Sequence, residues 1–218
     1  MTQLPRIRKR GRRTGRQPAA RSQILDALSQ VLERAPLSHP SLRAVASKAG
    51  VSPALLHYHF GDLPGLMGCL FDERALPLMQ PLLQDLQAAE ANASAALTRF
   101  VQKWTALTLR HPWLTAALLK SPARALDPSG SFGSVVREAV ARAQQQGAVR
   151  RDLPDHYVAL LLLCLGAMPH LAQSPLAAGI DAQPLLNPHG ATTLTLLHLS
   201  ALQAGVASAQ SPRHESAS

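Results

Sequence analysis

Apolar residues recur at every third or fourth position along most of the chain, which is the spacing of one face of an amphipathic helix. Stretches rich in proline, glycine and polar residues separate these runs, and such stretches end helices. The pattern predicts an all-α fold of about nine helices. They are expected over residues 18–34, 42–49, 53–60, 62 to about 86, 93–110, 113–120, 132–146, 154–173 and 189–207.

The second and third of these helices lie close together and carry strong end signals. Ser41 can cap the first of the two, and Gly50 follows it where a left-handed residue ends a helix. Ser52 then caps the next helix, with Pro53 at its first position. This spacing predicts a helix-turn-helix, whose second helix enters the DNA major groove. Spacing alone fits an ordinary αα-hairpin equally well.

Two of the later helices are more apolar than the outer layer of a single chain requires. Residues 157–168 are almost unbroken apolar sequence, and helix 189–207 has leucines on more than one side. A helix that is apolar all round has to be buried. We therefore expect helices 154–173 and 189–207 to pack against a second copy of the chain as a four-helix bundle.

The positive charge of the chain is concentrated at one end. The net charge is +9; residues 1–50 hold 11 Lys/Arg and 2 Asp/Glu, whereas residues 51–218 hold 11 of each. Double-stranded DNA would bind such a segment through its phosphates. Arg10, Arg12 and Arg13 lie in an arm with too few apolar residues to offset the entropy of ordering, so the arm is expected to be disordered and to reach DNA. The alternative is a solvated tail.

These patterns divide the chain into four parts. Residues 1–17 are the basic arm, 18–62 the helix-turn-helix domain, 63–207 a larger helical domain and 208–218 a disordered tail. Pro77 and Pro81 fall inside the helix that begins the larger domain, so a bend or break is expected near Leu76.

Several classes of protein are not favoured by the sequence. Two widely spaced cysteines and the lack of an apolar leader indicate a reduced, cytoplasmic protein, and no apolar run is long enough to span a membrane. None of the nine histidines forms an HxxxH or HExxH pair, so neither a metal site nor a cofactor is expected. Nucleotide-binding and nucleophile-elbow motifs of enzymes are also missing, and no enzyme is predicted.

The helix-turn-helix carries a more specific signal in its own residues. Ala49-Gly50-Val51-Ser52, followed by Leu56-His57-Tyr58-His59-Phe60, resembles the DNA-binding signature of the TetR/AcrR family of transcriptional regulators. The resemblance extends from about Ile24 to Leu66. It implies a homodimeric DNA-binding regulator, most often a repressor, that responds to a small-molecule effector bound in the larger domain.

The resemblance also implies roles for individual residues. Arg43 stands where some members contact a guanine, and a guanidinium fork fits the guanine edge. The start of the second helix would read bases through apolar contacts, and its later residues would meet the sugar-phosphate backbone. Leu63 departs from the pattern, which usually has lysine. The expected DNA contacts are Arg43, Ser52, Pro53, Ala54, Leu55, His57, Tyr58, His59, Arg10, Arg12 and Arg13. For His59, helix packing is the alternative.

The effector site is predicted only in outline. Low charge in the larger domain favours an apolar or weakly polar effector of unknown identity. Candidate lining residues are the aromatic, histidine and methionine side chains Phe100, Trp104, His111, Trp113, Met168 and His170; the alternative is that they form ordinary core. A different class of function stays open, namely a helical interaction or ligand-binding protein of the same fold that does not act through DNA.

Overall fold

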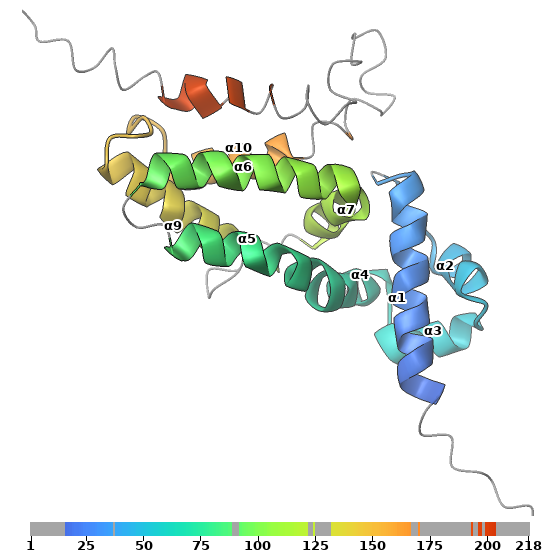
Figure 1. The fold of residues 1–218 in the computed structure, drawn as a ribbon. Helices are drawn as coiled ribbons and strands as arrows, with labels where there is room; N and C mark the ends of the chain where they lie inside the picture. The colour runs from blue at the N-terminus through green and yellow to red at the C-terminus, as the bar shows by residue number, and fades with distance from the viewer. Residues whose placement is uncertain are drawn as a thin grey trace, which may run out of the picture.

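The computed structural model describes residues 16–36, 38–88, 92–121, 124, 132–166, 170, 193, 196, 197 and 199–203. Within these residues all regular secondary structure is helical and no strand occurs, as the hydrophobic pattern predicts. A compact unit of three helices lies at one end of the molecule, and a larger helical bundle extends from it (Figure 1). Among the described residues, no helix is both long and apolar enough to cross a membrane.

The three-helix unit consists of α1 (Arg16–Arg34), α2 (Leu42–Ala49) and α3 (Pro53–Phe60). Helix α1 starts two residues before the predicted position. Its side chains Ile24, Leu25 and Leu28 are fully buried, and they pack in one core with Val45 of α2 and Leu56 of α3. The hydrophobic stripe read from the sequence is therefore the face that joins the three helices.

Helix α4 (Leu63–Leu70) leads out of this unit and continues through a π-helical turn, η1 (Phe71–Ala75), into α5 (Leu76–Ala88). The irregularity expected near Leu76 thus takes the form of a π turn within a continuous helical path. Pro77 explains its position, because proline has no N–H to donate to the carbonyl of Glu73, four residues earlier. Pro81 lies inside α5, and the helix continues past it.

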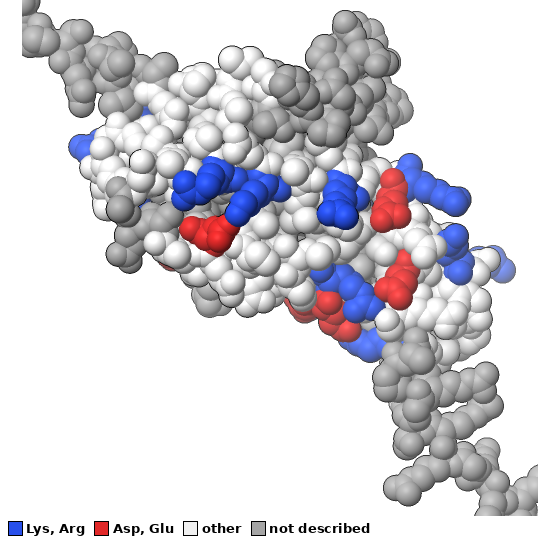
Figure 2. Space-filling model, in the orientation of Figure 1, with Lys and Arg blue, Asp and Glu red and all other residues white. Residues whose placement is uncertain are grey.

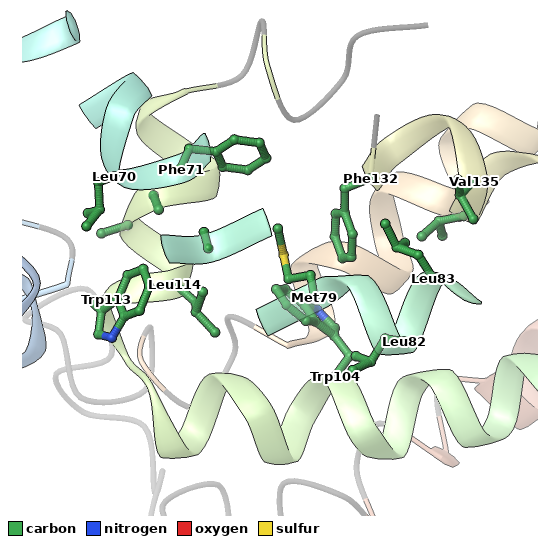
Figure 3. Close-up of a cluster of buried hydrophobic side chains, with 14 of the residues drawn as sticks. Leu70, Phe71, Met79, Leu82, Leu83, Trp104, Trp113, Leu114, Phe132 and Val135 are labelled. Atoms are coloured by element: carbon green, nitrogen blue, oxygen red, sulfur yellow. The ribbon is translucent and has the colours of Figure 1, made fainter. Parts of the chain in front are cut away.

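The larger bundle adds α6 (Ala93–Arg110), α7 (Trp113–Lys120), α9 (Phe132–Gln145) and α10 (Asp155–Leu165). Its core is built around Trp104 and Phe132, whose ring centroids lie 5.1 Å apart, with Met79 beside them (Figure 3). Trp104 Nε1 donates a hydrogen bond to the carbonyl of Leu163, 3.2 Å away, which ties α6 to α10.

The C-terminal part of the bundle is described only at some positions. Helix α10 ends at Leu165, and His170 is again helical and buried. The helix predicted over 189–207 is represented by scattered helical residues up to Gln203. Leu199 is buried against the core, while Leu197 is 60% exposed. The predicted tail at 208–218 lies outside the described residues.

Candidate nucleic-acid interface

Local capping fixes the turn between α2 and α3. The Ser41 hydroxyl accepts a hydrogen bond from the N–H of Ala44, at 3.1 Å, and the Ser52 hydroxyl accepts one from the N–H of Leu55, at 3.2 Å. Gly50 ends α2 with φ 64° and ψ 31°, a left-handed conformation that glycine adopts without strain. These residues make α2, the turn and α3 a helix-turn-helix, and α3 is called the recognition helix below.

The outward face of the recognition helix carries the residues predicted to touch DNA. Ser52, Pro53 and Ala54 are exposed at its start, and Leu55 is half-buried. Tyr58 is 74% exposed, an unusual position for a large aromatic side chain. The structure also exposes Arg43 (on α2) and His57. Arg10, Arg12 and Arg13 lie outside the described residues.

Two histidines near the end of the recognition helix are held differently. Nδ1 of His57 faces the carbonyl oxygen of Gly61, so this nitrogen must carry the proton of that hydrogen bond. Donation to a phosphate would then come from Nε2 and would require the imidazolium form. His59 is half-buried, with its ring edge-on to Tyr58, and its Nε2 is buried without a hydrogen-bond partner. This environment favours the packing role for His59.

Leu63, at the position where the family pattern usually has lysine, begins α4 rather than facing away from the protein. It is half-buried and packs against the hydrophobic core. Its side chain therefore contributes to the joint between the recognition helix and α4.

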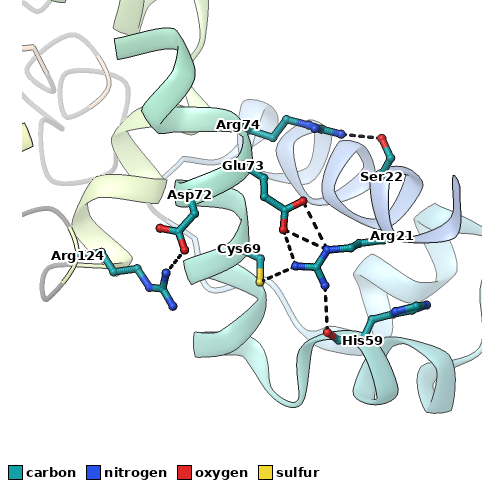
Figure 4. Close-up of polar contacts among 8 residues, drawn as sticks. All are labelled: Arg21, Ser22, His59, Cys69, Asp72, Glu73, Arg74 and Arg124. Carbon is teal, nitrogen blue, oxygen red and sulfur yellow. Dashed lines mark hydrogen bonds and ion pairs between the residues drawn. The ribbon is translucent and has the colours of Figure 1, made fainter. Parts of the chain in front are cut away.

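An arginine of α1 links the recognition helix to the π turn (Figure 4). Arg21 forms an ion pair with Glu73 and donates to the carbonyl of His59 at 3.3 Å and to Cys69 Sγ at 3.1 Å. Its guanidinium carbon lies 4.7 Å from the centre of the Phe60 ring. The hydrogen bond to Glu73 raises the pKa of Arg21 further. Neither Arg21 nor Glu73 stands out in the sequence, because partners 52 positions apart leave no local signal.

The charge distribution on the described surface is mixed. On the face shown in Figure 2, most of the described surface is uncharged, and the basic side chains form small groups, several of them beside acidic ones. Ion pairs among the described residues include Lys103 with Asp85 and Arg124 with Asp72. Six of the seven basic residues between Arg6 and Arg16 precede the described part of the chain. Much of the positive excess therefore belongs to the N-terminal segment.

The residues predicted to line an effector site are mostly buried in the packed core. Phe100 and Trp104 both lie against Phe132, and Trp113 of α7 lies near His111. Trp113 lies apart from Trp104 and Phe132 (Figure 3). His170 is buried, with Nε2 3.0 Å from the carbonyl oxygen of Thr108, and burial lowers the pKa of His170. Met168 lies outside the described residues.

A hollow of about 260 Å³ occurs between α9 and α10 in the described part of the bundle. It is lined by small residues, by leucines, and by Arg137 and His156. None of these residues belongs to the set predicted to line the effector site.

Comparisons with known proteins agree with this architecture. A segment of 82 residues is 33% identical to the HTH-type transcriptional regulator BetI of Burkholderia thailandensis, and the match spans 38% of this chain and 38% of that protein. A TetR-family transcriptional regulator from Pectobacterium atrosepticum superimposes with a TM-score of 0.52 at 17% identity, covering 89% of this chain and 97% of that one. The transcriptional regulator FadR from Bacillus subtilis, solved in complex with stearoyl-CoA, superimposes with a TM-score of 0.56 at 15% identity, covering 84% and 98%. No protein-family model matches the sequence.

The chain has the fold of TetR-family transcriptional regulators, and the resemblance to this family read from residues 49–60 is confirmed. These similar proteins are all transcriptional regulators. The sequence match covers well under half of the BetI regulator, so it informs only part of the chain.

Proposed function

We propose that this protein is a DNA-binding transcriptional regulator that acts as a homodimeric repressor and leaves its operator when a small molecule binds. The observation that carries the proposal is the helix-turn-helix itself. Its recognition helix is capped and packed on one face, while Pro53, Ala54 and Tyr58 are exposed on the other. Such a role on the chromosome would place the protein in the cytoplasm.

The proposed contacts divide into base reading and backbone binding. Arg43 would form the bidentate bond to guanine O6 and N7, and the apolar start of α3 would meet thymine methyl groups. Tyr58 and His57 would bind phosphates, which fix the register of a protein on the duplex. The arm containing Arg10, Arg12 and Arg13 would add contacts in the minor groove.

The second copy would pack on α10 and the helix that follows it. Tyr157 and Leu160 of α10 are each 47% exposed, and Leu197 is 60% exposed. The hollow between α9 and α10 borders Leu160. Exposed apolar side chains beside a hollow are typical of an interface that a partner covers. Residues 63–207 would then serve both dimerisation and effector binding.

The effector would be predominantly apolar. FadR from Bacillus subtilis binds a ligand with a long acyl chain, according to the complex in which it was solved. The described interior of the larger domain is likewise lined by aromatic and aliphatic groups, with Phe100, Trp104 and Phe132 at its centre. Because these rings are packed together, an effector would have to displace them, and that displacement would be the signal.

A gel-shift titration with random duplex DNA at low salt tests the proposal against a role without DNA. A DNA-binding regulator of this charge slows the migration of random duplex at low salt. The complex dissociates as the salt concentration rises. A helical interaction or ligand-binding protein of the same fold leaves the duplex unshifted. The control is Tyr58→Ala, which removes an exposed side chain of the recognition helix and should weaken the shift.

A further inference from the structure

The π turn carries three consecutive charged residues that face two different parts of the molecule (Figure 4). Glu73 pairs with Arg21 of α1, and Arg74 donates to Asp26 and Ser22 of the same helix. Asp72 instead pairs with Arg124, which lies beyond α7 in the larger domain. The turn is therefore tied on one side to the DNA-binding unit and on the other to the larger domain. π-helical turns are rare in proteins, and those that occur are frequently found at functional sites.

Arg21 carries this connection to the recognition helix. Its guanidinium contacts Glu73, the Cys69 sulfur, the His59 carbonyl and the Phe60 ring at the same time. His59 and Phe60 form the last turn of α3. Guanidinium suits this role because its five N–H donors are fixed in one plane, whereas an ammonium group is a single point of charge.

We propose that Arg21 is a positioning residue, which keeps the recognition helix in its DNA-reading orientation. It does so only while its guanidinium is paired with Glu73 of the π turn. Loss of the Arg21–Glu73 pair would release this link and lower the affinity for the operator. The inference rests on the proposed function, because it names a residue that positions the same DNA-binding surface.

The Arg21–Glu73 ion pair is too exposed to contribute much to the stability of the fold. The side chains of Arg21 and Glu73 are 34% and 38% exposed. Exposed ion pairs contribute little to folding, so breaking this one should lower Tm by no more than about 4 °C. A larger effect on DNA binding than on stability would therefore point to positioning.

The test uses the full chain and a duplex that the wild-type protein selects from a random pool, with an unrelated duplex alongside. Arg21→Lys preserves the net charge but cannot span all four contacts. It should weaken binding to the selected duplex about tenfold, the value of one charge-assisted hydrogen bond, and binding to the unrelated duplex less than twofold. The salt dependence of binding should not change.

Glu73→Ala separates positioning from simple electrostatics. It makes the protein more basic by one charge, so attraction to phosphate alone would strengthen binding. The proposal expects weaker binding to the selected duplex. The matched control is Asp85→Ala, which adds the same charge by breaking the exposed Lys103–Asp85 pair between α5 and α6, away from the DNA-binding helices. This control should retain wild-type specificity.

Wild-type specificity in both Arg21→Lys and Glu73→Ala would overturn the proposal. An equal loss on the two duplexes would also overturn it, because Arg21 would then act only through charge or stability. Hydrogen exchange of the α3 amides provides a readout without DNA: it should become faster in Arg21→Lys and not in Asp85→Ala, and unchanged exchange would count against positioning. Failure of the wild-type protein to select any duplex would contradict the proposed function instead.

Discussion

Two leucines of α10, only two positions apart, should respond to substitution in opposite ways. Leu160 is 47% exposed in the single chain, whereas Leu162 is fully buried. If a second copy covers α10, Leu160→Ala should weaken the dimer and leave the fold of each chain nearly intact. Leu162→Ala should lower the stability of each chain by creating a cavity.

The size of each effect follows from the burial. Burying a whole leucine side chain is worth about 1.5–3 kcal/mol, so covering the exposed half of Leu160 is worth about 1 kcal/mol. Two copies meet at a two-fold interface, which gives about 2 kcal/mol per dimer, or roughly thirtyfold in the dimer Kd. Leu162→Ala should cost about 2–5 kcal/mol, a large part of the usual stability of a domain.

Sedimentation equilibrium and thermal melts over a range of protein concentrations distinguish the two effects. Leu160→Ala should shift the equilibrium towards the monomer and make Tm less dependent on protein concentration. Leu162→Ala should lower Tm at every concentration. A dimer that is unaffected by Leu160→Ala and by Tyr157→Ala would refute the assignment of α10 to the interface.

Three further predictions concern DNA binding and pH. Arg43→Ala should cost about 1–3 kcal/mol on a selected operator and much less on random DNA; an equal cost in filter-binding titrations would show that Arg43 touches only phosphate. Deletion of residues 1–15, which removes six Lys/Arg, should flatten the slope of log affinity against log salt by up to about 5, and an unchanged slope would make the arm a solvated tail. Because burial lowers the pKa of His170 in the folded chain, the unfolded chain binds a proton first, and stability should fall as pH drops below about 6.5. Urea unfolding between pH 5 and 8 should show a flatter dependence in His170→Gln than in the wild type.

Features encoded in neighbouring residues could be predicted from the sequence. Ser41, Gly50 and Ser52 define the helix-turn-helix because each acts on groups within three or four positions of itself. The prolines placed the irregularity near Leu76, although they did not show that it would be a π turn.

Features that depend on distant partners could not be predicted. Arg21 is one of several polar residues on α1, and its role depends on Glu73, which only the packing of α4 brings near. In the same way, the apolar run of α10 predicted burial but not which side a single chain covers. Leu162 faces the core and Leu160 does not. An aromatic side chain in a sequence cannot be assigned to core or to cavity, so Trp104 and Phe100 stay candidates for an effector site.

Genome-wide mapping of the DNA bound by the wild-type protein tests the central claim most directly. A homodimeric regulator that reads DNA through α3 should give a small number of sharp sites that share a two-fold symmetric sequence, because the symmetry of the protein is repeated in its operator. The same sites should be lost in a variant with Arg43→Ala and Tyr58→Ala combined. Diffuse occupancy without a shared sequence, unchanged in that variant, would contradict the account.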